Sequence, residues 1–403
     1  MRILLISRCP PWPLYLGDRL IVYHLAEELE GRKHELDLLA FADRPEDWQQ
    51  QDEYNHLFNT VQLFKEPPRS QSSYLKRLLL PTRRFPTRAD RSWSPEMWQA
   101  IEQKLAHNQY DAIHLFGGIQ VYEFYNALGG RKAIITPYES FSLYLRRVIE
   151  NTKMREGLRP SPTQIVNRIQ HQIAQRFESF MFTPYANTVV VSGRDRDELV
   201  QINPKLNVTV ISNGVDTYEF RPRPVQRIPA LLFVGNYEYA PNVDAAMRLA
   251  TEIFPAVQAR VSQVRLWLVG NAPPPEMMAL ESDSIRVTGR VPDVRPYLAR
   301  ASAFVSPLRL GAGIKNKILE ALAMGCPVIG TPVSLDGIAV QDGHDVLAAD
   351  GTAMIDGIVR LLQDADLRKQ LSTNGRKLIE ARYSWGQVAQ EYEHLYKNLS
   401  VLK

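Results

Sequence analysis

Short runs of apolar residues alternate with amphipathic segments along the whole chain. Runs such as 2–7 and 111–116 have the length and composition of buried strands. After the first of them, Ile21, Leu25 and Leu29 recur every four positions, which is the spacing of one face of a helix. We therefore predict strands that alternate with helices, the pattern of parallel sheets that helices cover on both faces.

This rhythm repeats through two stretches of roughly 200 residues, which is too long for one core and favours two domains. A turn signal at 213–216 precedes 220–229, a polar segment that contains three prolines and has the composition of a linker. We predict one doubly wound domain over 1–212 and a second over 213–384. The predicted strands are 2–7, 36–41, 61–64, 111–116, 133–136, 188–192, 208–212, 230–235, 264–269, 284–288, 303–306 and 328–330. The predicted helices begin at Asp18, as N-cap, and at Ser94-Pro95, and further helices span 164–182, 243–260, 292–301, 314–324, 353–363, 366–382 and 385–399.

Composition narrows the function classes. The chain has 48 basic and 44 acidic residues, a balance that does not indicate nucleic-acid binding. Its two cysteines cannot form a disulfide framework or a four-cysteine zinc site. No apolar run is long enough to span a membrane, and the first residues do not have the pattern of a signal peptide. We expect a cytoplasmic protein.

Basic residues gather in the segment 65–94, which carries eight of them against two acidic residues. Leucines and two tryptophans lie within or near this segment. Two interpretations stay open. The segment could contact anionic lipid headgroups at the inner face of the membrane, or it could be a solvated loop that folds over an acceptor site.

The segment 306–328 reads as a strand, a glycine-rich loop, a helix and a second strand. Gly311 and Gly313 allow a backbone to approach a ligand closely. The helix that starts near Ile314 directs free N–H groups and a partial positive charge at this loop, which is a common phosphate site. Three side chains add full positive charge around the loop: Arg309, Lys315 and Lys317.

Glu320 lies on the same face of this helix as Asn316 and Lys317. A carboxylate beside a phosphate cradle would suit the two hydroxyl groups of a ribose, since it only accepts hydrogen bonds. We therefore predict a nucleoside diphosphate site at the carboxyl end of a parallel strand. The alternative is a glycine-rich turn with a Glu–Lys pair on a solvated helix.

Five segments in order resemble one enzyme family: 10–19, 191–216, 233–244, 287–293 and 317–328. They are similar to the retaining, nucleotide-sugar-dependent glycosyltransferases of family 4, which have the GT-B fold. The resemblance implies two Rossmann-like domains that face a central cleft, the first for the acceptor and the second for the donor. It also implies that the C-terminal helix, 385–403, crosses back onto the first domain.

The resemblance assigns roles to individual residues. Gly17 would lie beside the donor phosphates, Arg290 and Val291 would flank the nucleobase, and Glu320 would bind the ribose. From their charge and position, and not from the resemblance, we expect Arg309, Lys315 and the helix start near Ile314 to stabilise the departing diphosphate. The resemblance and the chemistry of the loop together give the expected donor-binding residues: Gly17, Gly235, Asn236, Arg290, Val291, Gly311, Gly313, Ile314, Lys317 and Glu320.

The chain departs from the family pattern at several positions. Ala312 stands where the family carries the first of two glutamates. Asn236 and Asn242 replace the usual arginine and lysine after the first donor-domain strand. Tyr138-Glu139 replaces a His-Asp pair, and Glu139 is expected to contact the acceptor or the donor sugar, with Tyr138 beside it on the acceptor side.

His114 has two interpretations, a hydrogen-bonded core histidine or an acceptor-side residue at the end of its strand. The Asp195/Asp197 and Asp364/Asp366 pairs match a two-aspartate metal motif. We expect both pairs to be solvated helix charges, since a divalent ion would need more oxygen ligands. The prediction is that the protein binds no metal and no cofactor.

The sequence thus predicts a retaining glycosyltransferase that takes a nucleotide-sugar donor and a glycan, lipid-linked or small-molecule acceptor. Same-face attack assisted by the departing phosphate is favoured, because no enzyme nucleophile is evident. A nucleotide-sugar epimerase of the same fold and a degenerate, non-catalytic sugar-nucleotide-binding protein remain alternatives. A nicotinamide dehydrogenase is disfavoured, because no Gly-x-Gly-x-x-Gly turn follows the first strand of either domain.

Overall fold

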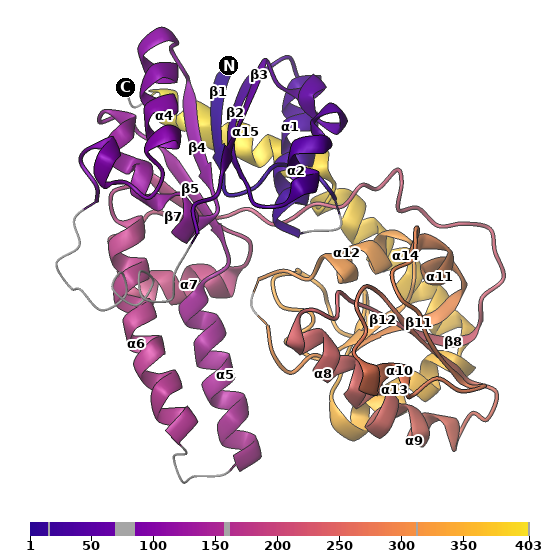
Figure 1. The fold of residues 1–403 in the computed structure, drawn as a ribbon. Helices are drawn as coiled ribbons and strands as arrows, with labels where there is room; N and C mark the ends of the chain where they lie inside the picture. The colour runs from indigo at the N-terminus through magenta and orange to yellow at the C-terminus, as the bar shows by residue number, and fades with distance from the viewer. Residues whose placement is uncertain (15–16, 69–84, 157–161, 312, 402–403) are drawn as a thin grey trace. The chain divides into compact units, whose positions relative to one another are not determined.

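The computed structural model describes residues 1–14, 17–68, 85–156, 162–311 and 313–401. The chain forms two compact units (Figure 1). Unit 1 comprises Met1–Asn213 together with Trp385–Lys403, and unit 2 comprises Gly214–Ser384. The sequence places the boundary one residue earlier, between 212 and 213.

Unit 1 is built on a parallel sheet of seven strands in the order β3-β2-β1-β4-β5-β6-β7. The order reverses between β1 and β4, and ligands bind at such a switch point in open α/β sheets. The strands are β1 (Arg2–Ser7), β2 (Glu35–Ala42), β3 (Thr60–Lys65), β4 (Ala112–Phe116), β5 (Ile134–Tyr138), β6 (Asn187–Val190) and β7 (Val208–Val210).

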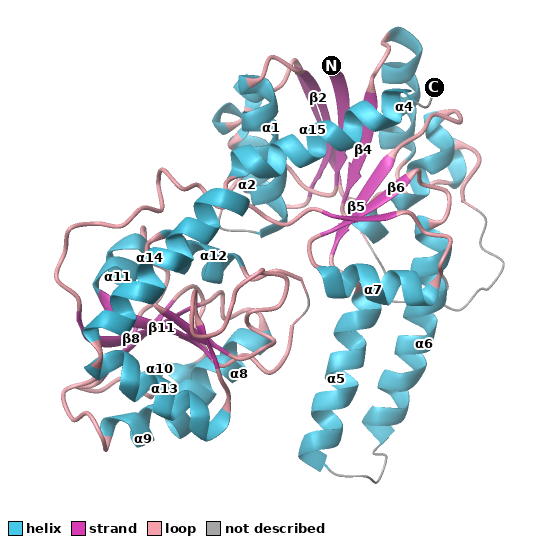
Figure 2. Cartoon of the chain, turned by 180° about the vertical axis from the view of Figure 1, so that it is seen from behind, coloured by secondary structure: helices cyan, strands magenta, loops and turns pink. Residues whose placement is uncertain are grey.

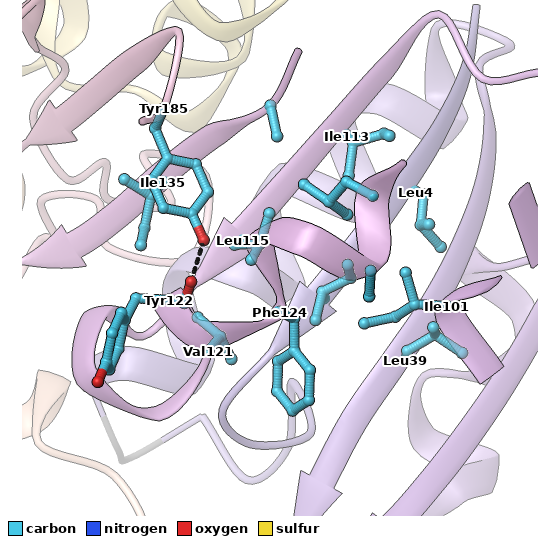
Figure 3. Packing of buried hydrophobic residues seen from close by; sticks show 14 of the residues in the cluster. Leu4, Leu39, Ile101, Ile113, Leu115, Val121, Tyr122, Phe124, Ile135 and Tyr185 are labelled. Carbon is cyan, nitrogen blue, oxygen red and sulfur yellow. Dashed lines mark hydrogen bonds between the residues drawn. The ribbon is translucent and has the colours of Figure 1, made fainter. Parts of the chain in front are cut away.

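Alternate residues of β1 pack on opposite faces of this sheet. Leu4 and Ile6 lie in a core with Ile101 of helix α4 (Pro95–His107), part of which Figure 3 shows. Ile3 and Leu5 lie in the other core, which helices α1 (Gly17–Gly31) and α15 (Trp385–Val401) complete. The C-terminal helix therefore belongs to the first unit.

Two long helices leave this layered body. Helices α5 (Phe141–Glu156) and α6 (Pro162–Phe182) pack side by side and project beyond the sheet in both views (Figures 1 and 2). Helix α7 (Gly193–Ile202) lies against both. The sequence pattern predicted α6 and missed α5, because the many polar residues of α5 interrupt its apolar face.

Unit 2 contains a parallel sheet of six strands in the order β10-β9-β8-β11-β12-β13. Helices cover both of its faces (Figure 2). The expectation of two doubly wound parallel sheets is thus confirmed. The strands are β8 (Ile228–Val234), β9 (Arg265–Val269), β10 (Ile285–Val287), β11 (Ala301–Ser306), β12 (Val328–Gly330) and β13 (Leu347–Ala348), and the principal helices are α8 (Ala240–Arg248), α9 (Phe254–Gln258), α11 (Arg295–Arg300), α12 (Asn316–Ala323), α13 (Gly351–Gln363) and α14 (Ala365–Arg382).

Three local predictions have different outcomes. The Ser94 cap is confirmed, because its hydroxyl accepts a hydrogen bond from the Met97 N–H at 3.3 Å. Asp18 is not an N-cap, since α1 begins at Gly17 and Asp18 lies within its first turn. The single helix predicted over 243–260 is two helices joined by a π-helical turn at Leu249–Ile253.

Across the described part of the chain, no helix has the length and apolarity needed to cross a membrane.

Candidate functional site

The loop between β11 and α12 has the backbone that its glycines suggest. Gly311 has φ 137° and Gly313 has φ 64°, a region that other residues rarely adopt. Lys315 follows in extended conformation as the N-cap of α12, and its Nζ donates to the Gly313 carbonyl oxygen at 2.6 Å. Ile314 is buried beneath the loop. The lysine amine therefore lies at the start of the helix, where an anion would bind.

Lys317 lies in the first turn of α12, and its amine contacts Asn242 and the ring of Phe233. Its Nζ donates to Asn242 Oδ1 at 2.7 Å and lies 4.5 Å from the centre of the Phe233 ring. The pKa of Lys317 is lowered to about 7, mainly by burial and to a smaller extent by the positive charge of Lys315, while Glu320 opposes the shift. An anion such as a diphosphate would restore the ammonium form.

Glu320 lies one turn further along α12. Burial raises the pKa of this carboxyl to about 7, and the opposing effect of Lys317 is smaller. The Glu320 side chain is partly exposed, so that a ligand can reach its oxygens. A half-buried acceptor of this kind is satisfied when a ligand supplies hydroxyl groups.

Arg309 has a partner that sequence reasoning missed. Its guanidinium donates twice to the Asp244 carboxylate, from Nε at 3.1 Å and from Nη2 at 2.9 Å. The side-chain hydrogen bond to Asp244 raises the pKa of Arg309. The expected phosphate ligand is thus already shared with a carboxylate from α8. The two residues are 65 positions apart in the sequence, which gives no signal of this pairing.

Three asparagines connect the ends of β8 and β9. The Asn242 amide donates to the Asn236 carbonyl at 2.8 Å, and the Asn271 amide donates to Asn236 Oδ1 at 3.3 Å. Gly235 lies beside Asn242, since a Cβ at Gly235 would be 3.2 Å from the Asn242 Cβ. The asparagine network therefore supports Lys317 through Asn242, at positions where the family pattern places cations.

The remaining donor-side predictions lie on the same edge of this sheet or in unit 1. Arg290 is exposed and Val291 is partly exposed, and both follow β10. Because all six strands are parallel, the segments after β8, β9, β10 and β11 share the carboxyl edge of the sheet. Gly17 is exposed at the first residue of α1 in unit 1. Ala312 lies outside the described residues.

The carboxyl edge of the unit 1 sheet holds a second polar cluster. Arg8 follows β1 and pairs with Asp18, with Nη1 and Oδ2 3.0 Å apart. Tyr138 ends β5 with φ 73°, and its hydroxyl donates to the Asp18 carbonyl at 3.3 Å. Gly117 follows β4, and a Cβ there would lie 2.5 Å from the Arg8 Cβ. Sequence reasoning selected Tyr138 and missed Arg8, although its position directly after the first strand was a signal.

The two other acceptor-side predictions have opposite surroundings. Glu139 is exposed at this edge, where a substrate can reach it. His114 is fully buried, with Nδ1 2.7 Å from the Tyr396 hydroxyl and Nε2 2.7 Å from the Thr136 hydroxyl. Burial lowers the pKa of His114 well below its usual value. The structure therefore supports the core interpretation and corrects the placement of His114 on the acceptor side.

The first two-aspartate pair is not a pair of solvated charges. Asp195 is fully buried and accepts a hydrogen bond from the Ser140 N–H at 2.8 Å, whereas Asp197 is exposed. Asp364 caps α14 by accepting from the Leu367 N–H. In the described ranges, no group of three or more His, Cys, Asp or Glu side chains could hold a metal ion.

Most of the basic segment 65–94 lies outside the described residues, since the structure leaves out 69–84. Neither interpretation of this segment is tested.

Two family models match the chain. The model described as Glycosyl transferases group 1 matches residues 228–364, and the model described as Glycosyltransferase Family 4 matches residues 20–219. The first match lies within unit 2. The second lies in unit 1, except for its last residues, which belong to unit 2. Together they cover most of the chain.

Individual proteins are similar to this chain over different lengths. The phosphatidyl-myo-inositol mannosyltransferase of Mycobacterium leprae is 27% identical over 203 residues, which are 47% of this chain and 53% of the relative. The chain thus spans about half the length of the curated relative it matches.

Solved structures share the fold over the full length. A sucrose-phosphate synthase from Thermosynechococcus elongatus has a TM-score of 0.72 at 19% identity, with 100% of both chains covered. The Anabaena protein Alr3699/HepE, in complex with UDP and glucose, has a TM-score of 0.63 at 15% identity, with 99% of this chain and 100% of that chain covered. These likenesses confirm the GT-B fold.

Proposed function

The chain belongs to the group 1 glycosyltransferases of family 4, and from this premise we propose that it transfers a sugar from a nucleoside-diphosphate sugar to an acceptor. The observation that carries the proposal is the arrangement of α12. Its first turns present Lys315, Lys317 and Glu320 at the carboxyl edge of a parallel sheet. Two basic side chains beside a carboxyl group match a diphosphate joined to a ribose.

The three side chains would act on different parts of the donor. Lys315 and the α12 N-terminus would bind the diphosphate as its negative charge grows on departure of the sugar. Lys317 would take up a proton as the diphosphate binds, because its pKa in the free protein lies at about 7. Glu320 would accept hydrogen bonds from the ribose hydroxyls. Arg309 would contribute less, because its charge is already paired with Asp244.

The acceptor would be a glycan, a lipid-linked sugar or a small molecule bound by unit 1. The polar cluster of Arg8, Asp18, Tyr138 and exposed Glu139 supports this proposal. Arg8 follows β1 at the switch point of the unit 1 sheet, and Asp18 joins it to Tyr138 at the end of β5. The mycobacterial relative is a mannosyltransferase by name, and the Anabaena protein binds UDP with glucose. A hexose donor is therefore the first to test.

Retention of the anomeric configuration is part of the proposal. Its support is the family membership. We propose attack on the face that the diphosphate leaves, assisted by the departing phosphate. Catalysis without a metal is likewise proposed, and unchanged turnover in EDTA would support it.

The test is a nucleotide-release assay with UDP-, GDP- and ADP-linked hexoses, with and without simple sugar acceptors. We expect one donor to be turned over, and product NMR should show the anomeric configuration of the donor. Glu320→Gln serves as the active-site control and should lower the rate. An inverted product would contradict retention.

A non-catalytic binding protein is the second candidate. The absent glutamate at Ala312 favours it, since that residue would contact the donor sugar in the family pattern. Binding of one nucleotide sugar without hydrolysis or transfer would support this candidate over the enzyme.

A further inference from the structure

Helix α6 has two apolar faces, although a surface helix normally has one. The first face packs into unit 1 through Ala174 and Met181, which are buried. The second contains Ile165, Val166 and Ile169, whose exposed fractions are 49%, 51% and 53%. No other helix of the described chain exposes three large aliphatic side chains this close together in sequence.

The second face forms one stripe along the helix. Ile165, Ile169 and the partly buried Ile173 are spaced by four, so they lie one above the other, with Val166 beside them. The stripe lies on the helical hairpin that projects from the sheet (Figures 1 and 2). A partner surface could therefore reach it without displacing the core.

The exposed charged side chains that α6 itself contributes beside the stripe have one sign. Arg168 and Arg176 are exposed and border it, three and seven positions from Ile165 and Ile169. The only acidic residue of α6 is Glu178, which is buried and accepts hydrogen bonds from the Phe141 and Ser142 N–H groups. The exposed surface of α6 thus combines aliphatic side chains with cations and presents no anion.

This combination selects among the partners that could cover the stripe. Two copies of the chain would bring arginines against arginines, and like charges oppose that contact. A neutral protein groove would leave the arginines without ion-pair partners. An anionic lipid surface accepts aliphatic side chains below its headgroups and cations at its phosphates.

We propose that α6 is a membrane-docking face, which binds the surface of a bilayer that contains anionic lipids through Ile165, Val166, Ile169, Arg168 and Arg176. The helix lies on the bilayer and does not cross it. This inference is independent of the proposed sugar transfer, because binding needs no nucleotide. It also differs from the membrane interpretation of 65–94, which concerns another segment.

The test is co-sedimentation of the full chain with vesicles of phosphatidylglycerol and phosphatidylcholine, against vesicles of phosphatidylcholine alone. We expect binding to the anionic vesicles that weakens as salt is added. The double variant Ile165→Glu/Ile169→Glu should bind roughly tenfold or more weakly, because it places carboxylates in the stripe. Arg168→Gln should reduce binding to anionic vesicles to a smaller extent.

The matched control is Val225→Glu, which changes an aliphatic side chain of unit 2 that is 45% exposed. It should bind vesicles like the wild-type protein. The thermal midpoint of the double variant should stay unchanged, since both side chains are half in solvent, and this separates lost docking from lost folding.

Equal binding by the double variant and the wild-type protein would overturn the proposal and would assign the membrane contact to the segment 65–94 instead. Absence of binding to either vesicle would overturn it too. A dimer in size-exclusion chromatography that the double variant dissociates would assign the stripe to a second copy instead.

Discussion

Lys317 and Glu320 lie three residues apart on α12, and at each of them burial opposes the charged form. The pKa of Glu320 rises from 4.5 to about 7 and that of Lys317 falls from 10.5 to about 7. The folded protein therefore holds Glu320 protonated between about pH 4.5 and 7, where the unfolded chain has lost that proton. Folding stability contributed by this group falls as pH rises through that window and stays lower above it.

Replacement of Glu320 by Gln should thus have opposite effects on stability and on function. At about pH 8 we expect the free energy of unfolding to rise by about 1–3 kcal/mol, because the desolvated charge is gone, with little change near pH 4.5. Affinity for the donor nucleotide should fall roughly tenfold or more, as expected on losing hydrogen bonds to a charged acceptor. Denaturant unfolding across pH and calorimetric titration measure the two effects. A variant that loses both stability and affinity would instead indicate a structural role.

His114 gives a second prediction at this scale. His114→Phe keeps an aromatic ring in the core and removes both ring nitrogens, which leaves the Tyr396 and Thr136 hydroxyls without these partners. We expect a loss of about 1–3 kcal/mol in unfolding free energy and an unchanged KM for the acceptor in the transfer assay. A raised acceptor KM in a variant of wild-type stability would restore His114 to the acceptor side.

The sequence predicts charge at this site better than it predicts pairing. Lys315, Lys317 and Glu320 are visible as charged residues around a glycine-rich loop, and the structure groups them at the start of α12. Their donor-binding roles stay predictions. Arg309 could not be seen as a partner of Asp244, because that pairing arises only when α8 packs beside the β11 end.

At the scale of elements, apolar runs locate strands well. The predicted strands in both units overlap observed ones, because a buried strand must be apolar on both faces in a parallel sheet. Short or polar elements escape this criterion. Strand β13 has two residues held by backbone pairing to β12, and α5 carries polar residues throughout.

Substitution of Gly270, which follows β9, tests how closely the ends of β8 and β9 approach each other. Gly270 has φ 153°, and a Cβ there would lie 1.7 Å from the Gly235 carbonyl oxygen. Gly270→Ala must therefore push apart the β8 and β9 ends that carry Asn236 and Asn271. We expect the variant to lose about 2 kcal/mol or more in unfolding free energy, together with donor affinity.

Gly343→Ala is the control for that substitution. Gly343 also has positive φ, at 71°, but a Cβ there meets nothing within 4 Å. It should show only the backbone penalty of about 1–2 kcal/mol and unchanged donor affinity. Denaturant unfolding measures both variants. Equal losses of unfolding free energy in Gly270→Ala and Gly343→Ala would mean that the contact between residue 270 and the Gly235 carbonyl adds no further cost.

At the scale of the whole molecule, each unit brings polar groups to the carboxyl edge of its own parallel sheet. Unit 2 presents cations with a carboxylate, and unit 1 presents Arg8 with Asp18 and Tyr138. The family membership was readable from the sequence because the order of five motifs was preserved. The nucleobase, the sugar and the acceptor could not be predicted from the sequence, since their recognition depends on side-chain contacts that no short motif encodes.

The central claim is that α12 and its glycine-rich loop bind a nucleoside diphosphate. The most direct measurement is isothermal titration calorimetry of UDP, GDP and ADP into the wild-type protein and Glu320→Gln at matched pH. We predict that one nucleotide binds the wild-type protein, with proton uptake above about pH 7 as Lys317 becomes charged, and that it binds Glu320→Gln roughly tenfold or more weakly. Absence of binding by all three nucleotides, or equal affinity of both proteins, would contradict the account.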